Sequence, residues 1–245
     1  MKLLYNIKND FKLIKRDKIL VLMLIFIIYL AIVLRFLIPW LDGYLIEKDI
    51  YHDLSTHFPL IIAYMVIFTG VMMLGGVYAF LTLDDKDDGV IMALMTTPIS
   101  PQKYLMKRLV MSAVLGFVAV MFLLYVVNVE VLPLFQTIYV SLGAALTAPL
   151  YMVFLVLISK GKVQGMSYGK IISFLAVLLI VAWFIKEPFE FIIGIFPPYW
   201  ISKGYWTLLE DNNLGYIYVG IGILFQLWAI KVLVGIFTNR IYKEI

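Results

Sequence analysis

The sequence predicts an all-α membrane protein in which six helices cross the bilayer. Hydrophobic residues make up 63% of the chain and charged residues 15%, whereas soluble proteins average roughly 45–50% and 25%. Apolar runs recur along the chain at about the 20 residues that a hydrocarbon core of ~30 Å requires. The Lys and Arg residues gather in alternate connections between these runs, as the positive-inside rule describes.

Five apolar runs are long enough to span a bilayer as helices. They cover residues 19–38, 60–83, 109–128, 134–158 and 214–237. A sixth run, 171–185, lies between Lys170 and Lys186 and reaches only about 22 Å as a helix. We count it as a span because the charge pattern requires it, and we expect it to use flanking residues such as Tyr168 and Gly169.

The distribution of cations orients the spans. With the N-terminus inside, the inner segments hold most of the Lys and Arg residues, and the outer loops hold Lys48, Lys186 and Lys203. Both termini are then cytoplasmic in a multi-pass protein of the cell membrane. The formal net charge of +4 follows from this orientation, so nucleic acid is not an expected partner.

We expect one domain over residues 1–245, with two segments besides the spans that lie at the membrane. Residues 1–18 place apolar side chains at helical spacing among lysines, which predicts an interfacial helix on the inner side. The alternative is a basic flank that only orients the first span. Residues 187–213 form an outer segment whose apolar part, 189–200, is too short to cross and too apolar for water, so we expect it to be re-entrant.

The loop at 84–101 is the most informative connection. An acidic run, Asp84 to Asp88, precedes a short amphipathic helix of about 87–97, which Asp87 or Asp88 can cap. Pro98 ends that helix, and Pro101 begins the next one. Three side chains share one face of the short helix and need a partner to cover them: Ile91, Leu94 and Met95.

Small residues and one proline recur inside the spans. Gly70, Gly75 and Gly76 of the second span indicate close helix contact or a flexible point, and Pro149 predicts a kink in the fourth. We interpret the small residues as packing positions, with a gating hinge as the alternative. Two small-xxx-small pairs suit helix contact: Ser112 with Gly116, and Ser141 with Ala145.

Several chemistries are not encoded. No histidine lies in a span, and no Asp or Glu lies at a span centre, whereas ion-coupled carriers need such groups. The stretch Gly165 to Ile171 has too few residues between its glycines, and an Ile where a phosphate loop needs Ser or Thr. We therefore expect no ATPase site and no bound cofactor or metal. Asp49, His52, Asp53 and His57 do not have a recognised ligand spacing.

Two alternative functions from other protein classes stay open. Asp84, Asp85 and Asp88 match the aspartate spacing of magnesium-dependent membrane prenyltransferases, but the second aspartate motif of those enzymes has no counterpart on the same side. The chain could alternatively be a non-transporting immunity-type or sensor membrane partner. A neighbouring ATPase gene would favour transport over both.

Taken together, these residues resemble the six-span permease subunits of ABC-2-type ATP-binding-cassette exporters over nearly the whole chain. The resemblance includes the basic N-terminal helix, the acid-rich loop, the turn at Thr97 to Ser100 and the outer segment before the last span. The end of the first span, from Arg35 to Trp40, is most similar to permeases of drug or fluoroquinolone exporters.

The resemblance implies an exporter of hydrophobic or amphipathic compounds that works as a homodimer or heterodimer of permeases. ATP and magnesium would bind to a separate ATPase subunit, and the loop helix would act as a coupling helix that docks into that subunit. The first, second and fifth spans would line the path, for which Phe68, Met72 and Met73 are candidates. The implied ATPase contacts are Asp87, Asp88, Val90, Ile91, Leu94 and Met95.

Overall fold

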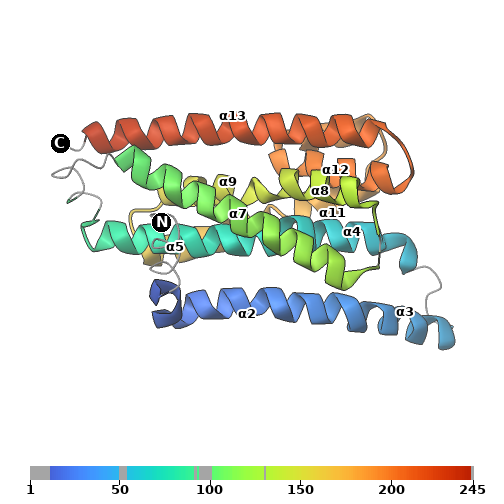
Figure 1. Ribbon diagram of the computed structural model, residues 1–245. Helices are drawn as coiled ribbons and strands as arrows, with labels where there is room; N and C mark the ends of the chain where they lie inside the picture. Colours follow the sequence, from blue (N-terminus) through green and yellow to red (C-terminus); the bar gives the residue numbers. More distant parts are fainter. Residues whose placement is uncertain (1–11, 50–53, 91–92, 94–100, 130, 244–245) are drawn as a thin grey trace.

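The computed structural model describes residues 12–49, 54–90, 93, 101–129 and 131–243. These residues form helices and no strands, and six of the helices are long and apolar enough to cross a membrane. The long helices run side by side along one axis, with α2 (Lys18–Ile32) and α13 (Leu214–Lys243) on opposite flanks of the bundle (Figure 1). The prediction of an all-α membrane protein with six spans is confirmed.

The first span is longer than the sequence predicts. It runs from Lys18 to Glu47, as α2 (Lys18–Ile32), a π-helical turn (Val33–Leu37) and α3 (Ile38–Glu47). The predicted end of the first span at residue 38 is therefore wrong. A proline inside a helix clashes with the carbonyl four residues earlier, and we attribute the wide turn just before Pro39 to this clash. The helix thus continues through Pro39 instead of ending there.

The second span also extends beyond its apolar run. It contains α4 (Phe58–Ile62), a π-helical stretch (Ala63–Gly70) and α5 (Val71–Asp87). In the wide stretch the hydroxyl of Thr69 donates to the carbonyl of Tyr64, at 2.8 Å. Such stretches are rare inside helices and are frequent at functional sites.

The third and fourth spans follow the sequence closely. The third is α7 (Pro101–Val127), which begins at the predicted proline. The fourth covers the expected 134–158 and breaks at Leu146 into α8 (Leu134–Ala145) and α9 (Thr147–Ile158). Pro149 cannot donate to Ala145, four residues earlier, so the kink predicted from this proline is confirmed.

The fifth span starts earlier than expected, at Lys162, because residues on both sides of Lys170 are helical. It consists of α10 (Lys162–Phe174) and α11 (Val177–Phe184), with a turn between them. The outer segment that follows does not cross. It forms a 3₁₀-helical piece (Phe189–Ile195) and α12 (Pro197–Leu209), which lies beside α8 and α13 near one end of the bundle (Figure 1).

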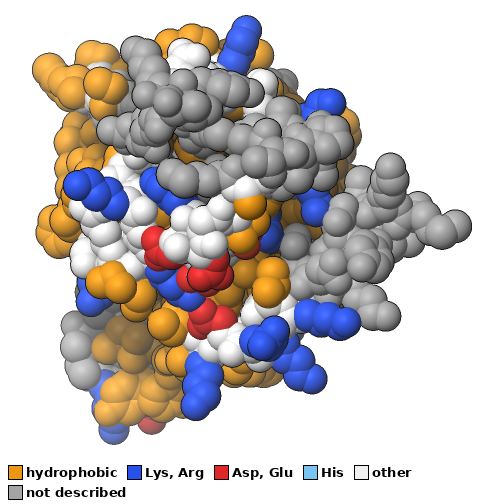
Figure 2. Space-filling view, turned by 90° about the vertical axis from the view of Figure 1, so that its left-hand side faces the viewer, with side chains coloured by type: hydrophobic (Ala, Val, Ile, Leu, Met, Phe, Trp, Pro, Cys, Tyr) orange, Lys and Arg blue, Asp and Glu red, His pale blue; other side chains and the backbone are white. Residues whose placement is uncertain are grey.

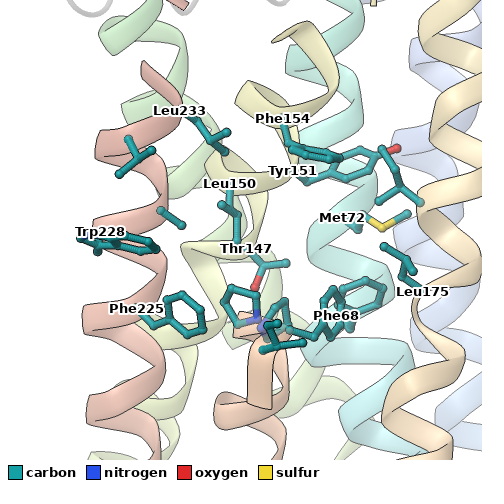
Figure 3. Close-up of a pocket in the computed structure, with 17 residues that line it drawn as sticks. Phe68, Met72, Thr147, Leu150, Tyr151, Phe154, Leu175, Phe225, Trp228 and Leu233 are labelled. Atoms are coloured by element: carbon teal, nitrogen blue, oxygen red, sulfur yellow. The ribbon is translucent and has the colours of Figure 1, made fainter. Parts of the chain in front are cut away.

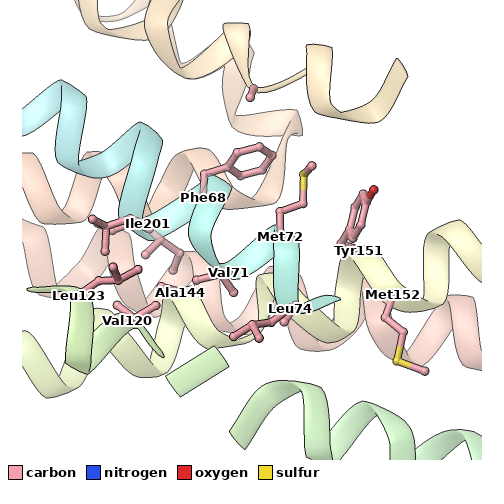
Figure 4. Close-up of a cluster of buried hydrophobic side chains, with 14 of the residues drawn as sticks. Phe68, Val71, Met72, Leu74, Val120, Leu123, Ala144, Tyr151, Met152 and Ile201 are labelled. Carbon is pink, nitrogen blue, oxygen red and sulfur yellow. The ribbon is translucent and has the colours of Figure 1, made fainter. Parts of the chain in front are cut away.

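The last span is α13 (Leu214–Lys243), which returns to the end of the bundle where α2 begins and α5 ends (Figure 1). The core lies where α5 contacts α7 and α9 (Figure 4). A Cβ atom at Gly75 of α5 would be 2.4 Å from the carbonyl oxygen of Ala148, and one at Gly116 of α7 would be 3.2 Å from that of Ala145. The small residues therefore act as packing positions, as predicted.

Candidate functional site: an apolar cavity and an ion cluster

An apolar cavity of about 360 Å³ lies among α5, α9 and α13 (Figure 3). Breaks in two other elements add to its lining: the turn after α10 and the junction before α12. None of its lining side chains is charged, and six are aromatic. The lining residues are Phe68, Met72, Thr147, Leu150, Tyr151, Phe154, Ile172, Leu175, Ile195, Phe196, Pro197, Pro198, Phe225, Trp228, Ala229, Val232 and Leu233.

Two of the three path candidates line this cavity. The ring of Phe68 packs edge-on against the ring of Phe196, with 5.4 Å between the ring centroids. Met72 lies one helical turn after Phe68. Both side chains are nearly fully buried. Met73 is not among the lining residues, because the next position along a helix points about 100° away from the previous one.

The contribution of α13 was not predicted from the sequence. Phe225, Trp228 and Val232 stand at positions i, i+3 and i+7, so they share the face that α13 turns to the cavity. This spacing is present in the sequence, but the nearly uniform hydrophobicity of α13 does not single out this face. The breaks at Leu175 and Phe196 give no comparable signal, apart from the two prolines that follow Phe196.

A buried polar contact joins α13 to the break in the fourth span. Gln226 of α13 is fully buried, and its Nε2 atom donates to the carbonyl of Gly143, at 3.1 Å. Its Oε1 atom accepts from the hydroxyl of Thr147, at 3.0 Å. Gln226 thereby bridges the two sides of the break at Leu146 and holds Thr147 in the cavity wall.

A second cluster, the basal ion cluster, lies at the end of the bundle where α5 ends. Lys162 Nζ forms ion pairs with Asp84, at 2.8 Å, and with Asp17, and Arg108 is paired with Asp85, at 2.8 Å. The backbone N–H of Lys162 donates to Asp87, at 2.9 Å. We define the basal ion cluster by these residues: Asp17, Asp84, Asp85, Asp87, Arg108 and Lys162.

The acidic run therefore closes the second span and does not open the loop helix as expected. Carboxylates at the C-terminus of a helix are opposed by the helix dipole. Lys162 and Arg108 compensate this repulsion, which explains why α5 continues to Asp87. Figure 2 shows this end of the molecule, with acidic side chains gathered near the centre and cationic side chains around them.

The cluster connects three parts of the chain to the end of α5. Asp17 caps α2 by accepting from the N–H of Ile19, at 2.8 Å. Partial burial raises the pKa of Asp17, but the hydrogen bonds from Lys162 and from the α2 backbone outweigh it, so the pKa lies below its ordinary value. The carboxylate of Asp85 also accepts a hydrogen bond from the hydroxyl of Tyr104 on α7.

The ion pairs of the basal ion cluster argue against the alternative function of a magnesium-dependent membrane enzyme. Asp84 and Asp85 are each held by a cation, whereas carboxylates that bind magnesium diphosphate must face the metal. Within the described part of the chain, no group of three or more His, Cys, Asp or Glu residues could hold a metal ion. The arrangement fits a structural brace.

The connection after α5 begins as a turn. Asp88 ends α5, Gly89 has a φ of +72°, and the N–H of Ala93 donates to the carbonyl of Gly89, at 3.0 Å. Val90 is 38% exposed. The other expected contacts with an ATPase subunit, Ile91, Leu94 and Met95, lie outside the described residues.

At the opposite end of the bundle, α12 is tied to the segment before it. Lys203 of α12 pairs with Glu190, at 2.6 Å, and with Glu187, at 2.8 Å. The hydrogen bond from Lys203 lowers the pKa of Glu187. Burial lowers the pKa of Lys203, but its two carboxylate partners outweigh this effect and raise it. The outer segment is thus held to α12 by two ion pairs.

Residues 10–234 match a protein-family model described as "Fluoroquinolones export permease protein Rv2686c-like". The chain belongs to this family. Two relatives, from Mycobacterium tuberculosis strains CDC 1551 / Oshkosh and ATCC 25618 / H37Rv, are named fluoroquinolones export permease proteins MT2760 and Rv2686c. Each is 26% identical over 228 residues, which cover 92% of this chain and 90% of the relative. No solved structure gives a significant match.

Membership in the Rv2686c-like family agrees with the resemblance that the sequence indicates. It identifies the chain as an export-type permease, and the six apolar helices make it a multi-pass membrane protein.

Proposed function

We propose that this chain is the membrane-spanning subunit of an ABC exporter that moves hydrophobic or amphipathic compounds outward. ATP and magnesium bind to a separate ATPase subunit in this proposal, and the permease has no cofactor of its own. The end that carries the basal ion cluster faces the cytoplasm, together with both termini, because most of the cations lie at that end of the spans.

The observation that carries the proposal is the position of the second span. Its middle supplies Phe68 and Met72 to the apolar cavity, and its end supplies Asp84, Asp85 and Asp87 to the basal ion cluster. In the proposal, the loop helix follows directly after this end. A force applied to that helix would therefore reach the cavity through α5.

The cluster supports this role because it braces the end of α5 against its neighbours. Arg108 is 5% exposed and Asp85 joins it to α5, so α7 is held to α5 at the base. Lys162 holds α10 to α5 through Asp84, and it holds α10 to the N-terminal cap of α2 through Asp17. In the proposal, Asp87 stays in this brace, and the ATPase subunit contacts Asp88, Val90 and the apolar face of the loop helix.

The relatives are named for fluoroquinolone export, so aromatic drugs of that class are the first substrates to test. A second permease copy, identical or not, is part of the proposal. The first, fifth and sixth spans are the least buried of the six, with 22–28% of their most apolar windows buried. These helices offer surface to lipid and to a second copy.

Co-purification of the ATPase subunit tests the coupling step. The apolar side chains of the loop helix are worth roughly 1.5–3 kcal/mol each when buried, so Leu94→Asp and Met95→Asp should release the ATPase subunit and abolish transport. Asn212→Asp is the matched control, because it adds the same carboxylate at an exposed site in the opposite loop.

The magnesium-enzyme reading predicts another ranking, in which Asp84→Ala stops function and Leu94→Asp is tolerated. A loop helix that only lies on lipid headgroups would keep the ATPase subunit bound in every variant. Unchanged ATPase retention in Leu94→Asp and Met95→Asp together would remove the coupling step from the proposal.

A further inference from the structure

The lining of the apolar cavity restricts what it can bind. We propose that the cavity binds planar aromatic molecules in their uncharged form, and that Thr147 selects those that carry an N–H or O–H donor. This inference rests on the proposed function, since it defines the substrate class of that exporter. For a drug with ionisable groups, it means that the net-uncharged, non-zwitterionic form is the one bound.

The first part follows from charge and shape. None of the lining residues is charged, and moving an ion from water into surroundings without a partner is strongly unfavourable. Aromatic rings from the second span, α9, α13 and the junction before α12 line the walls: Phe68, Tyr151, Phe154, Phe196, Phe225 and Trp228. Flat rings pack well against such walls in edge-on and offset arrangements. The volume of about 360 Å³ lies within the usual range of small-molecule pockets.

The second part follows from the hydrogen bonds of Thr147. The carbonyl of Gly143 only accepts, so the group of Gln226 that faces it, at 3.1 Å, is the amide nitrogen. The amide oxygen of Gln226 therefore faces Thr147, at 3.0 Å, and the Thr147 hydroxyl must donate to it. Because this hydrogen bond uses the only proton of the hydroxyl, Thr147 Oγ1 can only accept a hydrogen bond from any other group that approaches it.

Thr147 is the most deeply placed polar side chain of the cavity. It is 2% exposed, whereas Trp228 is 62% exposed and lies at the rim. The Tyr151 hydroxyl would be 3.0 Å from a Cβ atom at Gly169, so it points toward α10. Figure 3 shows the Thr147 oxygen on the side of the cavity where Phe225 lies. A ligand that reaches this oxygen gains a hydrogen bond only if it supplies the donor.

Three ligands with ring systems of nearly the same shape test the effects of charge and of the N–H donor separately. Acridone is neutral with one N–H group, N-methylacridone is neutral without it, and N-methylacridinium is a permanent cation. Their binding to the purified permease in detergent is measured by fluorescence titration. The variant Ala229→Trp, which fills the cavity from α13, gives the background from partition into the micelle.

For the wild type we expect acridone to bind about 2- to 10-fold more tightly than N-methylacridone. N-methylacridinium should bind more weakly than both by more than about tenfold. In the Thr147→Val variant, the affinity for acridone should fall to the affinity for N-methylacridone, which should itself not change. Thr147→Ser keeps the hydroxyl and should restore the preference, and general damage to the cavity would instead weaken both neutral ligands equally.

Cation binding as tight as that of acridone would overturn the first part. Equal losses for both neutral ligands in Thr147→Val would overturn the second. If no ligand exceeds the Ala229→Trp background, lipid or detergent occupies the cavity and the inference is wrong. The titration needs no ATPase subunit, so the expected binding pattern without ATP-driven export would contradict the proposed function and leave this inference standing.

Discussion

The contact between α5 and α9 makes Gly75 the most informative single position for stability. A Cβ atom there would lie 2.4 Å from the carbonyl oxygen of Ala148 and 3.0 Å from its Cα atom. Favourable contacts between carbon atoms occur at about 3.5–4.0 Å, so Gly75→Ala must push the two helices apart by roughly 1 Å. Extra atoms in a packed core cost about 1–3 kcal/mol.

The control is Gly235→Ala in α13, where nothing lies within 4 Å of the added atom. Both variants gain up to about 1 kcal/mol of helix propensity, so their difference isolates the steric cost. Thermal unfolding in detergent, followed by size-exclusion chromatography, should show Gly75→Ala less stable than the wild type and Gly235→Ala at least as stable. Equal stability of the two variants would refute the assigned α5–α9 contact.

Three further predictions concern charge and topology. Because the chain has no cysteine, an impermeant thiol reagent added outside should label Asn212→Cys and not Lys160→Cys; the reverse would invert the topology. Asp85→Ala removes the ion pair between Asp85 and the buried Arg108 side chain and should cost about 1–3 kcal/mol; an unfolding temperature equal to that of the wild type would contradict the pairing. The lowered pKa of Asp17 gives stability that is complete above its ordinary pKa of roughly 4 and is lost as pH falls through the lower folded value. Asp17→Asn should therefore remove part of the acid sensitivity of unfolding.

Much of the fold could be predicted because membrane spans have a simple physical signature. Apolar length identified five of the six spans, the charge pattern identified the fifth span along the chain, and Pro149 identified the break in the fourth. The ends were less predictable, since apolar length marks the hydrocarbon core and not the helix. The first span continues through Pro39 because a wide turn absorbs the proline, and the second continues to Asp87 because cations from other helices pair with its carboxylates.

The site could be predicted only in part. Phe68 and Met72 of the second span were path candidates that the family resemblance implied, and both line the cavity. The wall from α13 depends on which face of that helix turns inward, which its nearly uniform hydrophobicity does not decide. The partners of the acidic run are far apart in sequence: Asp84 pairs with Lys162, and Asp85 with Arg108. Such pairs follow from tertiary packing.

The proposed function is tested most directly by transport in inside-out membrane vesicles. Vesicles containing the permease and its ATPase subunit should accumulate a fluorescent fluoroquinolone when ATP is added. Vesicles containing the permease alone, or the complex with an ATPase subunit that cannot hydrolyse ATP, should not. The account predicts that accumulation requires both subunits and ATP hydrolysis. ATP-dependent accumulation by the permease alone, or accumulation that continues without hydrolysis, would contradict it.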